Sequence, residues 1–161
     1  MTEETWTIRP ARAEDAGTLG RLVGMLAEQM RAYDGPPGAA PDRWASYWRD
    51  RFVREAGQGN RIVLVAEAAG GTIVGFVEAL VEELSDMYEA DRVGSICNMW
   101  VEPSHRRRQL GQTLVERVLE CLRAKGCIDV TLQVALENDP AVQFYRKLGL
   151  RPVAYRMHKR L

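Results

Sequence analysis

The chain has 161 residues, of which 46% are hydrophobic and 27% charged, and these values predict one globular domain over residues 1–161. The 22 basic and 22 acidic residues cancel at neutral pH, so the net charge does not favour nucleic acid as a partner. The three cysteines, Cys97, Cys121 and Cys127, show no C-x-x-C spacing, so neither a disulfide framework nor a metal site is predicted.

The sequence also lacks the features of a membrane or secreted protein. Its first residues contain neither a basic segment nor the apolar core of a secretory signal, and no apolar run approaches the ~20 residues that span a bilayer. We therefore expect a cytoplasmic protein with no membrane partner.

The first third of the chain predicts one strand and two helices. Residues 5–9 favour a short strand, and residues 14–32 place apolar side chains at the i, i+3, i+4 spacing of a helix face. A break at residues 34–38 precedes a second helix over residues 41–55. The apolar stripe of this helix either forms a stacking platform for an aromatic ligand or packs on the domain; it comprises Trp44, Tyr47, Trp48 and Phe52.

The remainder predicts strands that alternate with helices. Strands are expected over residues 61–68, 72–82, 92–101, 128–136 and 153–161, and helices over residues 110–125 and 140–148. This order of elements indicates a mixed sheet with helices on its faces.

The first candidate site lies where a predicted strand leads into a helix, in the segment Val101-Glu-Pro-Ser-His-Arg-Arg-Arg-Gln-Leu-Gly. A helix N-terminus binds anions because its first N–H groups lack partners within the helix and the helix dipole is positive there. The arginines at 106–108 add positive charge, and Gly111 allows a ligand close to the backbone. The segment therefore indicates a diphosphate cradle, with a solvated basic loop or a nucleic-acid contact as the alternatives.

The second candidate site is the segment Asn138-Asp-Pro-Ala-Val-Gln-Phe-Tyr. A polar Asn138 follows a predicted strand, and the helix after it places Ala141 and Tyr145 on one face. A small residue beside a phenol suits a narrow channel in which the phenol donates a proton, although a tyrosine at this spacing, taken alone, is more often simply packed.

Together, in this order, the two segments resemble the GCN5-related N-acetyltransferase superfamily. The first resembles the family's acyl-CoA motif, [R/Q]-x-x-G-x-[G/A] after a strand, and the second resembles its N-x-x-A-x-x-[F/L]-Y segment. The matching residues are Val101, Pro103, Arg106, Leu110, Gly111, Asn138, Ala141, Phe144, Tyr145, Gly149 and Leu150. One position departs from the pattern, since Gln109 replaces the first motif glycine and brings a Cβ into a loop where glycine permits positive φ.

The resemblance implies an α/β fold, an acetyl donor and a set of contacts. The fold is expected to have a mixed, mostly antiparallel sheet of six or seven strands, about four helices, and parallel strands 4 and 5 splayed apart. Acetyl-CoA is the implied co-substrate. Residues expected to bind it are Met99, Trp100, Val101, Arg106, Arg107, Arg108, Gln109, Leu110, Gly111, Gln112, Asn138, Ala141, Phe144 and Tyr145.

The resemblance also implies a mechanism of direct transfer. The backbone amides of residues 107–112 would hold the pyrophosphate, Asn138 would contact the pantetheine, and an N–H at or near Met99 would polarise the thioester carbonyl. Tyr145 is the expected catalytic residue, protonating the CoA thiolate while an amine attacks directly in a ternary complex.

The general base and the acceptor remain open in the sequence. Ser95 and Gln133 occupy the positions where relatives carry a base, and neither is one. The carboxylates on or after the third strand are the remaining candidates for assisting a water-mediated base: Glu78, Glu82, Glu83 and Asp86. We expect a small-molecule or peptide amine as acceptor and leave a homodimer open. An acyl-CoA sensor or scaffold without turnover is the alternative function.

Overall fold

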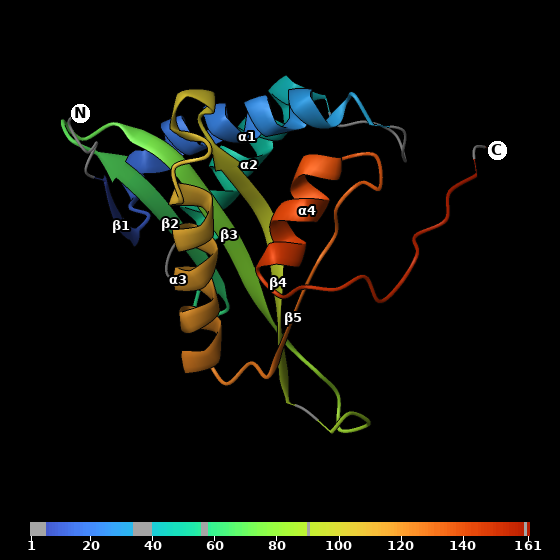
Figure 1. Cartoon of the computed structure of the whole chain (residues 1–161). Helices are drawn as coiled ribbons and strands as arrows, with labels where there is room; N and C mark the ends of the chain where they lie inside the picture. The colour runs from blue at the N-terminus through green and yellow to red at the C-terminus, as the bar shows by residue number, and fades with distance from the viewer. Residues whose placement is uncertain (1–5, 34–39, 56–57, 90, 160) are drawn as a thin grey trace.

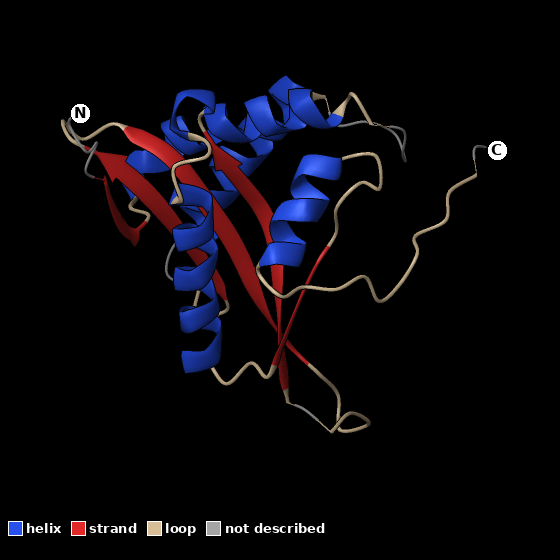
Figure 2. Ribbon diagram, viewed as in Figure 1, coloured by secondary structure: helices blue, strands red, loops and turns tan. Residues whose placement is uncertain are grey.

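The computed structural model of the chain describes residues 6–33, 40–55, 58–89, 91–159 and 161. The expected strand start at residue 5 and the break at 34–38 fall outside these ranges. The described residues form one sheet of five strands in the order β1-β2-β3-β4-β5, in which the first three pairings are antiparallel and β4 pairs with β5 in parallel (Figures 1 and 2). The strands are β1 Trp6–Pro10, β2 Arg61–Ala68, β3 Ile73–Glu83, β4 Arg92–Val101 and β5 Asp129–Leu132.

Within the described ranges, four α-helices cover the two faces of this sheet. They are α1 Ala16–Met30, α2 Pro41–Glu55, α3 Leu110–Ala124 and α4 Asp139–Lys147, with short 3₁₀ turns at Ala13–Asp15 and Pro103–His105. Figure 1 shows α3 and α4 on one face, while α1 and α2 lie behind the sheet. The expected mixed sheet with flanking helices is confirmed.

Strand alternation divides the core into two hydrophobic clusters. Side chains of β3 such as Val77, Ala79 and Val81 pack with the buried leucines and valines of α3. Phe76 points to the opposite face and packs with Trp48 and residues of α1. Because successive side chains of a strand point to opposite faces, neighbouring residues of β3 and β4 serve different sides of the sheet.

The end of the chain differs from the expectation. The strand predicted over residues 153–161 is wrong for the described part, since residues 150–159 and 161 carry no secondary structure and residues 151–159 are exposed. Figure 1 shows this segment running away from α4. The apolar side chains at 153, 155 and 157 alternate as in a strand, but a strand forms only with a hydrogen-bonded neighbour. The sheet therefore has five described strands instead of six or seven.

Candidate active site

β4 and β5 are paired over only part of their length. Parallel pairing runs from Val93 opposite Asp129 to Ile96 opposite Leu132, and the strands then separate. β4 continues from Cys97 to Val101 with no strand partner on its β5 side among the described residues. Backbone N–H and C=O groups need hydrogen-bond partners, so this open edge is suited to receive the amides of a ligand.

A β-bulge marks the point where the two strands separate. Glu78 of β3 stands opposite Asn98, whereas the next residue, Ala79, stands opposite Ile96, so Cys97 is the extra residue of β4. A bulge bends its strand and redirects the side chains around it. Cys97 is exposed, its Sγ donates to the Ser95 carbonyl at 3.4 Å, and partial burial raises the pKa of its thiol. The raised pKa disfavours the thiolate that a nucleophilic cysteine needs.

The loop before α3 keeps the conformation that a glycine would supply. Gln109 is the N-cap residue of α3 and lies in the left-handed region at φ 63°, ψ −10°, and Arg107 also has a positive φ of 62°. The left-handed region costs a non-glycine residue about 1–2 kcal/mol. Gln109 therefore adopts a left-handed conformation that a glycine would adopt without this cost, and the loop carries local strain.

Replacing Gln109 with glycine is expected to stabilise the fold by about 1 kcal/mol, because the left-handed conformation then carries no Cβ penalty. Urea unfolding should show a higher midpoint at an unchanged m-value. A lower midpoint would contradict the assignment of strain to this residue.

The three arginines of the loop occupy different environments. Arg106 donates from Nε to the Val101 carbonyl at 2.8 Å and from Nη2 to Gln29 Oε1 at 3.3 Å, and its guanidinium lies 4.7 Å from the centre of the Trp100 ring. Arg106 thus fastens the loop to the end of β4 and to α1. Arg107 and Arg108 are exposed beside the N-terminus of α3.

Three predicted site elements converge on Met99 of β4. A Cβ placed on Gly111 of α3 would lie 3.2 Å from Met99 Cε and 3.5 Å from the Phe144 ring of α4. The Tyr145 hydroxyl donates to Met99 Sδ at 3.7 Å, and the Phe144 and Tyr145 rings contact edge to face at 5.1 Å. Burial raises the pKa of Tyr145 above its ordinary value of 10.0, so the phenol keeps its proton at neutral pH.

The other predicted residues lie around this centre with separate contacts. Asn138 is the N-cap of α4, where its Oδ1 accepts the Ala141 N–H at 3.3 Å. Gln112 is exposed and bonds to Glu116 at 2.8 Å. Leu110 is fully buried in the α3 cluster, whereas Trp100 is buried in the cluster under α1 and α2, on the face opposite Gly111 and Tyr145.

Of the carboxylates proposed to assist a base, Glu78 differs from the expectation because it is buried. Its side chain is 1% exposed, so the alternative of a solvated carboxylate at a strand end is wrong for this residue. Its Oε2 accepts Trp48 Nε1 at 2.8 Å and the Nδ2 of Asn98, and its Oε1 lies 2.6 Å from Arg61 Nη2 as an ion pair. Glu82, Glu83 and Asp86 are exposed.

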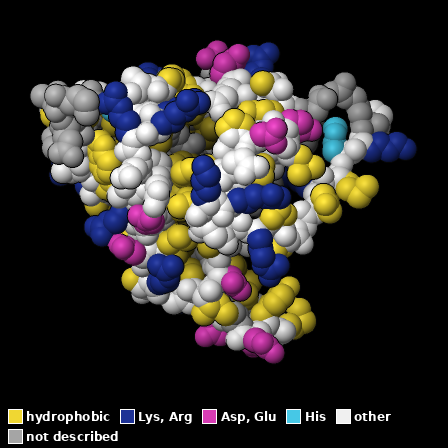
Figure 3. All heavy atoms as spheres, in the orientation of Figure 1, with side chains coloured by type: hydrophobic (Ala, Val, Ile, Leu, Met, Phe, Trp, Pro, Cys, Tyr) yellow, Lys and Arg dark blue, Asp and Glu magenta, His cyan; other side chains and the backbone are white. Residues whose placement is uncertain are grey.

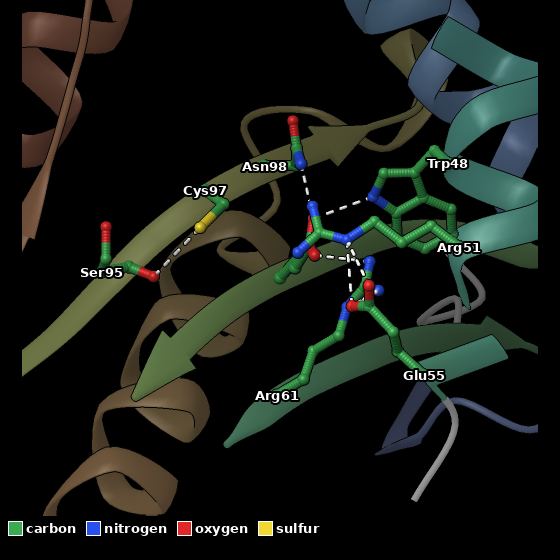
Figure 4. A network of polar contacts seen from close by, with 8 residues as sticks. Trp48, Arg51, Glu55, Arg61, Ser95, Cys97 and Asn98 are labelled. Carbon is green, nitrogen blue, oxygen red and sulfur yellow. Dashed lines mark hydrogen bonds and ion pairs between the residues drawn. The ribbon is translucent and has the colours of Figure 1, made fainter. Parts of the chain in front are cut away.

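Figure 4 shows the buried network to which Glu78 belongs. Arg61, whose side chain is 4% exposed, also bonds to Glu55 at 3.0 Å, and Glu55 in turn pairs with Arg51 of the same helix at 2.9 Å. Sequence reasoning missed this network. The signal was a glutamate in the middle of the apolar run of β3, since a buried charge needs a charged or hydrogen-bonding partner elsewhere.

The face that carries α3 and α4 is mixed in character. Figure 3 shows Lys and Arg side chains over these helices with hydrophobic side chains between them. Across the described ranges, the His, Cys, Asp and Glu side chains form no group of three or more that could hold a metal ion. The helices in those same ranges are too short or too polar to cross a membrane.

The chain is similar to known acetyltransferases. Residues 20–150 match the model of the acetyltransferase (GNAT) family. The sequence is 32% identical to glucosamine 6-phosphate N-acetyltransferase 1 of Oryza sativa over 91% of this chain and 81% of that protein. It is 34% identical to an uncharacterized N-acetyltransferase of Methanocaldococcus jannaschii over 91% of this chain, which spans only 61% of that protein's length.

The fold is similar to solved structures as well. A GCN5-related N-acetyltransferase of Ralstonia eutropha superposes with a TM-score of 0.77 at 22% identity, over 98% of this chain and 99% of that one. The glucosamine-6-phosphate N-acetyltransferase of Arabidopsis thaliana superposes with a TM-score of 0.70 at 24% identity, over 98% and 99% of the two chains.

Proposed function

The chain belongs to the GNAT family of acetyltransferases, and from this premise we propose that it transfers the acetyl group of acetyl-CoA to a primary amine of a small molecule or peptide. Acetyl-CoA is the acetyl donor of this family. The observation that carries the proposal is the convergence of Met99, Gly111 and Tyr145 beside the unpaired edge of β4.

The residues present fit this donor. The missing Cβ at Gly111 lets Met99 and Phe144 lie close to the helix backbone, and the first turn of α3 offers N–H groups without a partner inside the helix for a pyrophosphate, beside Arg107 and Arg108. The open edge of β4 from Met99 to Val101 would take the amides of the pantetheine arm. Asn138, at the start of α4, would contact the pantetheine arm.

The proposed chemistry is a direct attack. The amine nitrogen forms a bond to the thioester carbonyl carbon, the C–S bond breaks, and Tyr145 gives its proton to the departing thiolate. An N–H at or near Met99 stabilises the negative charge that develops on the carbonyl oxygen. We expect the amine to lose its proton through water, because Glu78 is buried and ion-paired and the other candidate carboxylates are exposed.

Tyr145→Phe is expected to lower kcat by about 100-fold while leaving the affinity for acetyl-CoA nearly unchanged, because the ring is kept and only the proton donor is lost. Thioester absorbance gives the rate, and a thermal-shift titration gives the binding. An unchanged kcat would remove Tyr145 from the chemistry, and a parallel loss of binding would make its role structural.

The experiment that tests the proposed function is an amine panel with acetyl-CoA. The panel contains glucosamine 6-phosphate, spermidine, a tripeptide with a free N-terminus and an aminoglycoside. The reaction is followed by thioester absorbance, which avoids reagents that also detect protein thiols such as Cys97. Amine-dependent thioester loss with at least one panel amine supports the proposal. Binding of acetyl-CoA without turnover across the panel would favour the sensor instead.

A further inference from the structure

Asn98 lies next to Met99 on β4 but serves the other face of the sheet. Met99 contacts Gly111 and Tyr145 on the side of α3 and α4, whereas Asn98 bonds to Glu78, which is held by Trp48 of α2. The proposed donor would occupy the α3 and α4 side. An attacking amine therefore has the α2 side left for its approach, at the part of β4 after Ile96 where pairing with β5 has ended.

The chemistry of Glu78 fixes which way the Asn98 carboxamide points. An ionised carboxylate only accepts hydrogen bonds, so the Asn98 atom that faces it must be the Nδ2 amide nitrogen. The carbonyl oxygen Oδ1 then lies at the other end of the group, and Figure 4 shows it pointing away from the dashed hydrogen bond that the Asn98 nitrogen makes. Asn98 is only half-buried, unlike Glu78.

The Glu78 carboxylate, which sets the orientation of the Asn98 carboxamide, has two further partners. Trp48 Nε1 donates to it at 2.8 Å, and Arg61 pairs with it at 2.6 Å. The Arg61 guanidinium lies near two stacked aromatic rings, 5.2 Å from the centre of Trp48 and 5.9 Å from that of Phe52. A buried carboxylate held by one hydrogen bond and one ion pair supports the fixed geometry that a reaction site requires.

We propose that Asn98 orients the acceptor amine by accepting one of its N–H groups at Oδ1, and that Glu78 is a positioning residue that holds the carboxamide in this orientation. The inference rests on the proposed function and adds to it that the amine approaches from the side of the sheet that carries α2. A primary amine that donates one N–H to Oδ1 keeps its nitrogen lone pair free to attack the thioester carbon. A tertiary amine has no N–H to donate when neutral, so the site selects amines with N–H groups.

The first test replaces Asn98 with alanine and with leucine, which lacks the polar atoms at similar size. The probe is glucosamine 6-phosphate, or the panel amine with the highest rate if that is a different one. We expect kcat/KM for the amine to fall about 10-fold, the effect of one lost hydrogen bond to a reacting group, with the Kd for acetyl-CoA unchanged. An unchanged kcat/KM for the amine, or a loss confined to acetyl-CoA binding, would overturn the inference.

The second test asks whether Glu78 acts through Asn98. Glu78→Gln should lower kcat/KM for the amine in the wild-type background and have no further effect in the Asn98→Ala background, since residues acting as a unit are not additive. Glu55→Gln is the matched control, because Glu55 pairs with Arg51 and Arg61 but has no bond to Asn98. Additive losses would overturn the positioning role.

The outcomes distinguish a failure of the proposed acetyl transfer from a failure of the role proposed for Asn98. If the wild type consumes no thioester with any panel amine, the proposed function fails and this inference fails with it. If the wild type is active and Asn98→Ala matches it in kcat and in KM for the amine, the inference alone fails. If Glu78→Gln does not fold, the Asn98 variants decide the matter, because Asn98 is only partly buried.

Discussion

Gly111→Trp is expected to abolish the response of the protein to acetyl-CoA. At 100 times Kd, a ligand that binds only the folded state stabilises it by about 2.7 kcal/mol, which raises the melting temperature of a domain this size by about 5–10 °C. An indole at 111 would displace Met99 and Phe144 at the proposed donor site, because even a Cβ there comes within 3.2 Å of Met99 Cε. The wild type should show the rise in melting temperature, and the variant should show none.

The control for this prediction is Gly17→Trp on α1. A Cβ at Gly17 would meet no other heavy atom within 4 Å, and Gly17 is exposed, so the added indole should leave the acetyl-CoA response intact. Equal responses of Gly111→Trp and the wild type would place the donor elsewhere on the protein. Loss of the response in both tryptophan variants would point to a general effect of the added ring.

Arg61→Met is expected to lower the free energy of unfolding by about 3–5 kcal/mol, the range found when one partner of a buried ion pair is removed. The cost arises because the Glu78 carboxyl group, whose side chain is 1% exposed, would be left in the interior without the cation that pairs with it. Urea unfolding measures the change. The double variant Arg61→Met/Glu78→Leu should recover part of the loss, since a matched apolar pair leaves no buried charge behind.

The matched control is Arg117→Met, which breaks an ion pair with Glu120 whose two side chains are 57% and 58% exposed. Exposed pairs of this kind contribute at most about 1 kcal/mol. A loss for Arg61→Met no larger than that of the control would mean that water reaches Glu78, and the rigid network proposed around Asn98 would then lack its basis.

The sequence predicts best the elements whose side-chain periodicity is strong. The helix expected over residues 41–55 is α2 with the same bounds, and the helix expected from residue 110 is α3. In the stripe on α2, Trp48 and Phe52 pack in the core as one alternative expected, whereas Trp44 and Tyr47 are 37% and 62% exposed. Helical spacing predicts which residues share a face of the helix. It does not predict which of them the sheet covers, because that depends on how far the sheet extends along the helix.

The parts that the sequence did not predict depend on contacts between distant segments. The tail at 153–161 alternates like a strand, yet pairing requires a neighbour that no local pattern reveals. The partners of Glu78 come from α2, β2 and β4, and only the fold brings Trp48, Arg61 and Asn98 to one carboxylate. The two motif segments were predicted better, because each is a short continuous stretch of sequence. In the structure, Asn138 is the N-cap of α4 and Gln109 is the N-cap of α3.

The measurement that tests the central claim most directly follows the acetyl group itself. Acetyl-CoA labelled with ¹³C in the acetyl group is incubated with the protein and the best panel amine, and the products are identified by mass spectrometry and NMR. The proposed function predicts the label in an amide bond to the amine nitrogen, formed at a rate that Tyr145→Phe lowers about 100-fold. Label recovered only as unreacted acetyl-CoA or as free acetate, with every amine of the panel, would contradict it.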